Sequence, residues 1–391
     1  MQSNGVNPDL SRKNIQRVFG THFSEGNRVA LLKDKESFSL IFDSIRKAKK
    51  LICLEFYIYR NDETGTELAE ILRQKASEGI SVYVIYDHFG SMSTPLKFWQ
   101  SLKQAGVRIR ASRPFKWSAP FHYVHRDHRK LIIIDGCCAF TGGLNIANEY
   151  RGYHFIREKL ARKKKGWRDT AIYLEGPIVG RLFDEFRKTW EIWKGEPIPP
   201  VDAPAPLENG LPVVPIFASS ARGRRRMRKL LHYSINRSQR KIYLTTAYFT
   251  PSRRMLQILE DAVSRGVEVK LLLPGKSDVT AALYAARAYF TRLIRAGIVI
   301  YTYSGEILHA KTAVFDGVWS VIGSANLDFQ SLRRNDEGNV GIRDEGFGGQ
   351  MCDAFYEDLK NSEKVDLGKW LARPLCEKIK ERFYAIFRMR L

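Results

Sequence analysis

Two stretches of the chain repeat the same order of apolar, polar and glycine positions, and this duplication constrains the fold more than any other feature. The first is KKLICLEFYIYRNDETGTELAEILRQKASEGISVYVIYD, residues 49–87, and the second is RKIYLTTAYFTPSRRMLQILEDAVSRGVEVKLLLPG, residues 240–275. Each predicts a strand, a polar turn, an amphipathic helix and a second strand. Strands that alternate with helices of this length are typical of α/β architecture. The sequence therefore predicts two similar α/β halves.

A proline-rich segment, residues 194–215, separates the two stretches and fits neither a helix nor a central strand. We place the boundary between the halves near its middle. The predicted divisions are an N-terminal extension, a first half, a second half and a basic amphipathic C-terminal segment, at residues 1–27, 28–204, 205–364 and 365–391.

Each half contains one H-x-K-x4-D motif. The members are His128, Lys130 and Asp135 in the first half, and His309, Lys311 and Asp316 in the second. In an extended strand, the histidine and lysine of each motif point to the same face. The aspartate has the opposite parity and precedes a glycine, which is typical of a turn. The spacing thus presents histidine and lysine together and favours a structural role for the aspartate.

A small-residue turn that ends in asparagine follows each motif. Its polar or small members are Gly143 and Asn145 in the first copy, and Ser324 and Asn326 in the second. A glycine or serine here would let backbone N–H groups approach an anion, and the asparagine amide adds a donor. Two copies around a pseudo-two-fold axis would surround one small anion. We therefore expect a phosphate site that uses no metal and no cofactor.

The paired histidines suggest a mechanism of displacement at phosphorus. A neutral imidazole can attack phosphorus while a protonated one donates to the leaving oxygen, since the ordinary histidine pKa allows both forms near neutral pH. Each histidine then needs a carboxylate on its other ring nitrogen. We expect Glu337 to orient His309 and Asp169 to orient His128, with Glu149 as the alternative in the first half.

The charge of the chain predicts an anionic partner. Lys and Arg number 64 against 42 Asp and Glu, which gives a formal net charge of +22. Nucleic acid, an anionic membrane and phosphorylated small molecules are all anionic partners that would fit this net positive charge. Three stretches are especially basic: residues 157–168, 221–231 and 374–391. In the last, apolar residues recur at helical spacing, which fits either a helix in a membrane interface or a helix packed on the domain.

The sequence predicts neither a signal peptide nor a transmembrane helix. No apolar core follows the first residues, and no window approaches 18 uncharged apolar residues. The five cysteines form no CxxC pair and no disulfide framework, which favours a reducing compartment.

The paired motifs resemble those of the phospholipase D superfamily. HRKLIIIDGCCAFTGGLNIANEY and LHAKTAVFDGVWSVIGSANLDFQSLRRNDE are similar to segments of short bacterial cardiolipin synthases, and the likeness covers roughly residues 28–360. The resemblance implies two halves, each with a mixed sheet flanked by helices, and one active site between them. It also implies transfer of a phosphatidyl group between two phosphatidylglycerol molecules, with release of glycerol.

By the same resemblance, both complete motifs are catalytic. His128 matches the nucleophile and His309 the acid. Phosphate-binding positions are matched by Lys130, Lys311, Asn145 and Asn326, and a carboxylate partner by Glu337.

Many members of this family begin with transmembrane helices, whereas none is predicted in this sequence. We therefore expect the protein to meet an anionic phosphatidylglycerol surface peripherally, on the cytoplasmic face of the bacterial inner membrane. Aromatic residues just before the first motif could insert beside the site: Phe115, Trp117, Phe121 and Tyr123. A hydrolytic phospholipase D would carry the same motifs, because the choice of water or alcohol depends on pocket shape. A nuclease of the same superfamily fits the charge. We expect no nucleic-acid partner, since the likeness outside the motifs follows the lipid enzymes.

Overall fold

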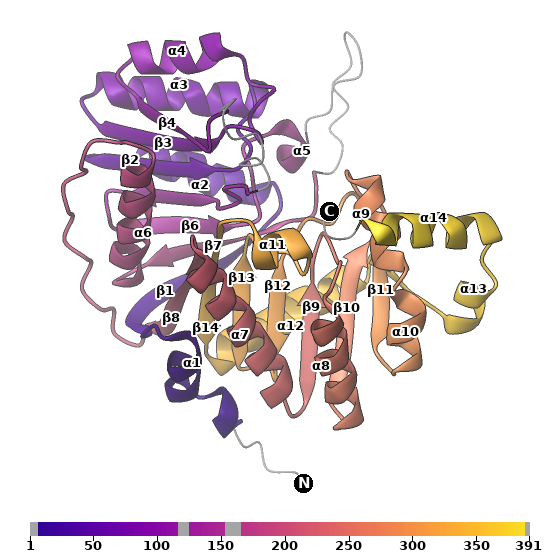
Figure 1. Ribbon diagram of the computed structural model, residues 1–391. Coiled ribbons are helices and arrows are strands. Elements are labelled where there is room, and N and C mark those ends of the chain that lie inside the picture. Colours follow the sequence, from indigo (N-terminus) through magenta and orange to yellow (C-terminus); the bar gives the residue numbers. More distant parts are fainter. Residues whose placement is uncertain (1–6, 116–124, 153–165, 388–391) are drawn as a thin grey trace.

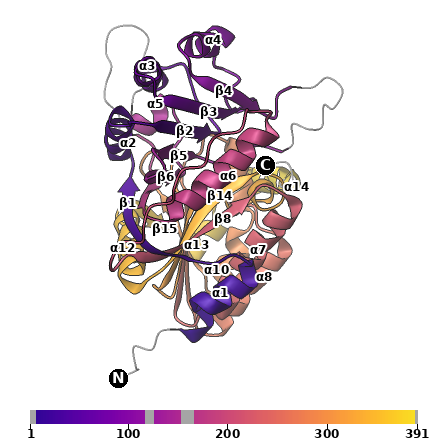
Figure 2. The same cartoon turned by 90° about the vertical axis from the view of Figure 1, so that its left-hand side faces the viewer.

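A computed structural model describes residues 7–115, 125–152 and 166–387. These residues form one 15-stranded β-sheet with helices packed on both of its faces (Figure 1). Seen from the side, the first half lies above the second, and the sheet runs through both (Figure 2).

The first half contains seven strands of the sheet. Their bounds are β1 Ser24–Lys33, β2 Leu51–Phe56, β3 Ser81–Asp87, β4 Arg108–Ser112, β5 Leu131–Ile134, β6 Cys138–Gly142 and β7 Thr170–Glu175. The helices up to the end of this half are η1 Pro8–Leu10, α1 Arg12–Phe19, α2 Glu36–Arg46, α3 Glu63–Ser77, α4 Leu96–Gln104, α5 Asn148–Arg151 and α6 Ile178–Ile192.

The second half repeats this arrangement and adds a short edge strand. Its strands are β8 Leu211–Ala218, β9 Lys241–Thr245, β10 Glu268–Pro274, β11 Val299–Tyr303, β12 Thr312–Phe315, β13 Trp319–Gly323, β14 Glu337–Arg343 and β15 Ser362–Lys364. Its helices are α7 Ala221–Arg237, α8 Arg253–Ser264, α9 Thr280–Arg287, α10 Phe290–Arg295, α11 Phe329–Arg333, α12 Glu345–Leu359, α13 Leu367–Leu371 and α14 Leu375–Ile386.

The strand order confirms the predicted duplication. From the outer edge inward, the first half runs β4-β3-β2-β5-β6-β7-β1 and the second runs β11-β10-β9-β12-β13-β14-β8, with β15 beyond β11. Both halves mix parallel and antiparallel pairs, as the resemblance implies. The innermost strands β1 and β8 pair antiparallel, with Ser24 opposite Val213, so the two sheets become one.

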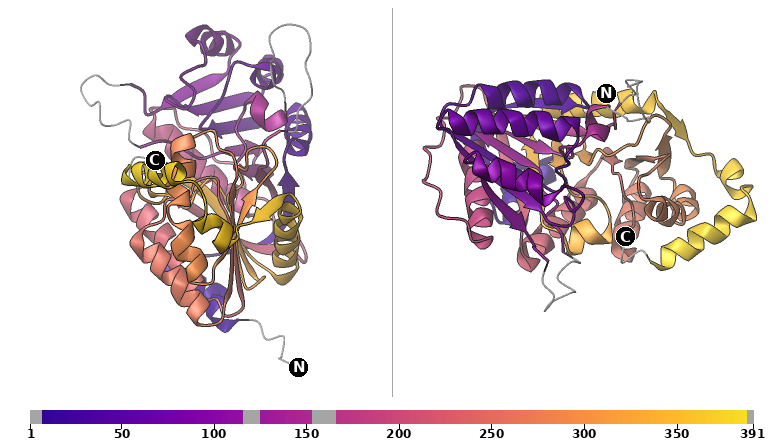
Figure 3. Two further views of the ribbon diagram at one scale, coloured as in Figure 1. Left: turned by 90° about the vertical axis from the view of Figure 1, so that its right-hand side faces the viewer. Right: turned by 90° about the horizontal axis from the view of Figure 1, so that it is seen from above.

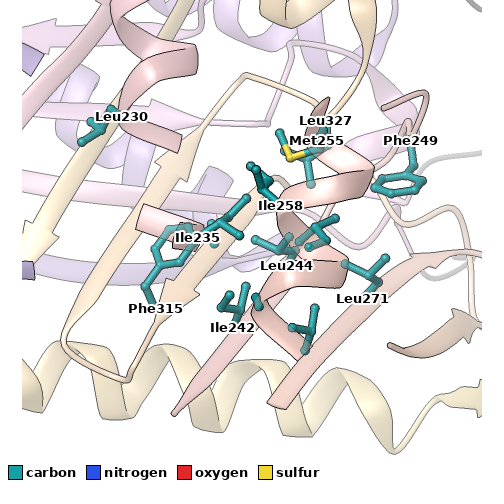
Figure 4. Close-up of a cluster of buried hydrophobic side chains, with 14 of the residues drawn as sticks. Leu230, Ile235, Ile242, Leu244, Phe249, Met255, Ile258, Leu271, Phe315 and Leu327 are labelled. Atoms are coloured by element: carbon teal, nitrogen blue, oxygen red, sulfur yellow. The ribbon is translucent and has the colours of Figure 1, made fainter. Parts of the chain in front are cut away.

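The amphipathic helix α8 illustrates how the predicted pattern forms the core. The Ser252 side chain caps its first turn by accepting the Met255 N–H at 3.2 Å. Met255 and Ile258 are buried in the cluster that also contains Leu244 of β9 and Leu271 of β10 (Figure 4). On the opposite face, one buried cluster under α6 and α12 continues from the first half into the second. This shared core fixes the two halves relative to each other.

The residues predicted as an N-terminal extension, 1–27, include α1 and the start of β1. Ile15 and Phe19 of α1 are buried in the same cluster as Met227 and Leu230 of α7. The described part of this segment therefore belongs to the core of the second half. Among the helices of the described ranges, none is long and apolar enough to cross a bilayer.

Candidate active site

The two motifs meet where the halves join. His128 and Lys130 immediately precede β5 rather than lying in it, and His309 precedes β12 in the same way. The reason is that each motif backbone pairs with the opposite half. The His128 N–H donates to the carbonyl of Asp336 at 2.9 Å, and the His309 N–H donates to that of Arg168 at 2.7 Å. Each motif thus runs beside the segment that carries the other half's carboxylate.

The histidine–carboxylate pairs are crossed between the halves. Nδ1 of His128 lies 3.1 Å from Oε2 of Glu337, and Nδ1 of His309 lies 2.7 Å from Oδ2 of Asp169. Our assignment of Glu337 to His309 and of Asp169 to His128 is therefore wrong, because each half supplies the carboxylate for its partner's histidine. Glu149 orients neither histidine; its carboxylate lies 3.1 Å from the guanidinium of Arg60.

Gly143 leaves space for the carboxylate of Asp169, Ser324 binds that of Glu337, and neither offers its N–H group to an anion. Each donates its backbone N–H to a carbonyl of the adjacent strand, β7 or β14. A Cβ at Gly143 would lie 2.1 Å from Oδ1 of Asp169. In the second half, the hydroxyl of Ser324 donates to Glu337. The predicted phosphate-binding role of these two residues is therefore wrong, since both N–H groups are already used.

The two asparagines are anchored through their amide oxygens. Oδ1 of Asn145 accepts the N–H of Ile58 at 3.0 Å, and Oδ1 of Asn326 accepts that of Tyr248 at 3.3 Å. The amide nitrogen of Asn145 donates to the Tyr150 hydroxyl at 2.7 Å. Within the described ranges the amide nitrogen of Asn326 has no acceptor, so this donor is available to a bound anion.

Both motif lysines are buried beside the histidines. Nζ of Lys130 donates to the carbonyl of His128 at 2.6 Å, and Nζ of Lys311 donates to that of His309. Burial lowers the pKa of Lys130 to about 7 and that of Lys311 to about 8. An anion between them would favour the charged forms of both.

Burial also lowers the pKa of both histidines, more strongly for His309, and the adjacent lysine adds to the effect. Lys130 and His128 both contribute to the shift at His309, so the four motif groups are close enough to interact across the halves. Burial raises the pKa of Asp169 to about 6. For Glu337, burial opposes ionisation, but His128 and its other neighbours lower the pKa overall. The two histidines are therefore neutral near pH 7 before substrate binds.

The motif aspartates lie at the far ends of β5 and β12, away from the histidines. Asp135 accepts the backbone N–H groups of residues 49–51 at 2.7–2.8 Å, and Asp316 accepts those of residues 239–241 at 2.8–3.2 Å. Both have a left-handed backbone, with φ of 53° and 55°. They fix the starts of β2 and β9, which is the structural role that strand parity predicts for them. The prediction that the two aspartates are catalytic is wrong.

Aromatic side chains that we did not predict enclose the histidines. The rings of Tyr57 and His128 have centroids 4.9 Å apart, and Tyr150 and Trp167 lie 5.4 and 5.5 Å from His309. They occur beside strands or helices in segments whose composition is equally typical of a core. No feature of a single sequence separates these aromatics from ordinary packing residues.

Two buried arginines brace the crossed segments. Arg129, between the first histidine and lysine, is 2% exposed and donates to Asp127 at 2.9 and 3.1 Å. Arg168, next to Asp169, binds both oxygens of Asp358 at 2.6 and 2.8 Å. Such charge-assisted, paired contacts hold the backbone that positions the histidines and carboxylates.

The comparisons with known proteins concern the sequence and the fold of the chain. A sequence model of the family described as "Cardiolipin synthase, PLD-like domain" matches residues 41–158 and 231–359, one segment in each half. The chain belongs to this family. Its predicted resemblance to bacterial cardiolipin synthases is therefore confirmed.

Individual relatives match most of the chain. The probable cardiolipin synthase YwiE of Bacillus subtilis is 33% identical over 93% of this chain and 72% of its own length. Cardiolipin synthase A of Pseudomonas fluorescens is 33% identical over 86% of this chain and 69% of its own. The crystal structure of phosphatidylserine synthase from Haemophilus influenzae has the same fold, with a TM-score of 0.73 at 15% identity, and covers 97% of this chain and 100% of that one.

Proposed function

We propose that the protein is a cardiolipin synthase that transfers a phosphatidyl group from one phosphatidylglycerol to the glycerol hydroxyl of another through a covalent phosphohistidine. The observation that carries the proposal is the crossed pair of histidines, each held by a buried carboxylate of the other half, with two buried lysines beside them. This arrangement suits two successive displacements at one phosphorus.

In the first step, neutral His128 attacks the phosphorus of the donor lipid. Glu337 accepts a hydrogen bond from the Nδ1–H of His128, which leaves the Nε2 lone pair free and stabilises the positive charge that forms on the ring. The N–P bond forms as the P–O bond to glycerol breaks. His309, which becomes protonated once the anionic phosphate is bound beside it, gives its proton to the departing glycerol oxygen. Lys130 and Lys311 stabilise the non-bridging oxygens.

In the second step, neutral His309 removes a proton from the glycerol hydroxyl of a second phosphatidylglycerol. That oxygen attacks phosphorus, the N–P bond breaks, and His128 returns to its starting form. The products are cardiolipin and one glycerol, and His309 again carries the proton needed for the next cycle. Asp169, whose pKa is raised to about 6 by burial, holds His309 in place during both transfers.

Membrane contact is supported by the C-terminal helix α14, which lies at the periphery of the second half (Figure 3). Apolar side chains at helical spacing are 41–74% exposed there: Leu375, Ile379, Phe383, Ile386 and Phe387. Lysines and an arginine lie among them at positions 378, 380 and 382. We infer that this face enters the interface of an anionic membrane, so that the protein binds peripherally.

We assign this binding to the cytoplasmic face of the bacterial inner membrane, since all five cysteines are free. Of the aromatic residues expected to insert beside the site, Phe115 is 47% exposed. Trp117, Phe121 and Tyr123 lie outside the described residues, as does most of the basic stretch 157–168.

One experiment separates the candidate functions. The purified protein is incubated with phosphatidylglycerol vesicles and, separately, with single-stranded DNA, each with a chelator, and the products are identified. Cardiolipin plus glycerol supports the proposal, whereas phosphatidic acid alone assigns a hydrolytic phospholipase D. Cleavage of DNA without lipid turnover assigns a nuclease. His128→Ala and His309→Ala should each abolish turnover, and a wild-type rate in either refutes the shared site.

A further inference from the structure

A cavity of about 150 Å³ lies among residues of α7, the start of α8 and α11 in the second half. Figure 1 shows where these three helices lie. Four basic side chains line the cavity, namely Arg228, His232, Arg253 and Arg333. We call this the basic pocket. Arg228 belongs to the arginine-rich stretch 221–231, to which the proposed chemistry gives no role.

The positive charges of the basic pocket are poorly compensated. Burial and the neighbouring arginines, Arg333 first among them, lower the pKa of Arg228, and burial with Arg254 and Arg228 lowers that of His232. No carboxylate of the described ranges forms an ion pair with any of these groups. A concave site lined by like charges without counter-charges favours a bound anion.

The local helix chemistry points the same way. Arg253 occupies the first position of α8, Arg254 follows, and the first turn of this helix contains no acidic residue. A helix N-terminus disfavours cations and favours anions, so this placement costs helix stability unless an anion binds there. The first-turn N–H groups and the arginines would then act on one ligand.

Asp328 is the acidic residue in the pocket wall, and it connects the pocket to the active site. Its carboxylate is buried, accepts the Ser331 N–H at 2.7 Å, and has its pKa raised by burial to about 7. It follows the active-site Asn326 by two residues, and its ionisation responds to Glu337 and Lys311. The basic pocket is therefore adjacent to the phosphate site and distinct from it.

We propose that the basic pocket binds the phosphate of a second anionic phospholipid head group while another lipid occupies the active site. The choice of a phospholipid as the source of the phosphate rests on the proposed function. A head group held here keeps lipid substrate beside the histidines, which lowers the KM for phosphatidylglycerol without taking part in the bond changes.

The test follows His232 by NMR in protein labelled at histidine, on a His128→Ala background that stops turnover. Short-chain phosphatidylglycerol should shift the His232 resonance, which a His232→Gln spectrum assigns, and neutral short-chain phosphatidylcholine should not. Arg253→Gln with Arg333→Gln should weaken this binding about tenfold or more, since a hydrogen bond to a charged group contributes about 1.5–3 kcal/mol. The matched control, Arg17→Gln with Arg265→Gln, removes two charges from α1 and the far end of α8 and should bind as the parent does.

Turnover in mixed micelles supplies an independent readout in protein with His128 intact. The Arg253→Gln/Arg333→Gln variant should raise the KM for phosphatidylglycerol about tenfold and leave kcat within about twofold. Equal KM values in this variant and the control would overturn the inference. So would a His232 shift caused by inorganic phosphate or single-stranded DNA but not by the lipid. If the wild type makes no cardiolipin and His232 still responds to phosphatidylglycerol, the proposed function fails and the pocket stands.

Discussion

The crossed pairing of histidines and carboxylates predicts different defects for Asp169→Asn and Glu337→Gln. Both carboxylates are fully buried, and each contacts a histidine at 2.7 or 3.1 Å. Removal of one partner from a buried charged pair costs about 3–5 kcal/mol. If that energy is lost in the transition state, kcat for phosphatidylglycerol should fall about 10²- to 10⁴-fold in either variant.

A substrate with a good leaving group separates the two defects. Phosphatidyl-p-nitrophenol releases its phenolate without an acid, so the burst of p-nitrophenol reports attack by the nucleophile alone. Asp169→Asn disturbs the acid His309 and should keep the burst rate within about tenfold of wild type. Glu337→Gln disturbs the nucleophile His128 and should lose about 10²- to 10⁴-fold. Melting curves confirm that both variants fold. Loss of the burst in Asp169→Asn but not in Glu337→Gln would refute the crossed roles.

Three further predictions concern stability, packing and membrane contact. Lys130→Met should abolish turnover yet stabilise the protein at pH 7. Burial lowers the pKa of Lys130 in the folded protein to about 7 from an ordinary 10.5, so the wild type gains stability as the pH rises between these values. The variant's advantage in the free energy of unfolding, measured by chemical denaturation, should therefore shrink over that range. Gly143→Ala should lower kcat about tenfold or more, because the added Cβ displaces Asp169; unchanged kinetics would show that the carboxylate tolerates the shift. Ile379→Glu with Phe383→Glu should weaken sedimentation with phosphatidylglycerol vesicles about tenfold or more and leave the Tm unchanged, since both side chains are more than half exposed; wild-type sedimentation would exclude this face of α14.

The fold was predictable from the sequence because its signals are local. The repeated strand, helix and glycine positions identify the duplication, and the buried stripe of α8 with Met255 and Ile258 follows directly from helical spacing. The pairing of β1 with β8 was not predictable. It joins residues nearly two hundred positions apart through backbone hydrogen bonds, and the pattern of side chains does not indicate which strands form them.

The candidate site was predictable in composition and only partly in geometry. Strand parity correctly separates Asp135 from His128 and Lys130, because alternation is a property of the backbone. The exchange of Asp169 and Glu337 between halves is a tertiary contact, and the spacing within one half carries no information about it.

The small residues after each motif gave a misleading signal. A glycine before an asparagine resembles an anion-binding turn, but Gly143 is small because the Asp169 carboxylate occupies the adjacent space. At the equivalent position, Ser324 accommodates the Glu337 carboxylate with a hydroxyl that donates to it. Two different residues at equivalent positions thus serve one purpose, which is visible only once the carboxylates are placed.

The central claim is that both halves build one site in which a histidine carries the phosphatidyl group. The most direct measurement is rapid acid-free quenching of the protein during turnover of phosphatidylglycerol, with mass spectrometry of the histidine-containing peptides. The account predicts a phosphatidyl adduct on His128 that forms and decays as cardiolipin and glycerol appear in equal amounts, and that is absent in His128→Ala. Cardiolipin formation at the wild-type rate with no adduct on either His128 or His309 would contradict it.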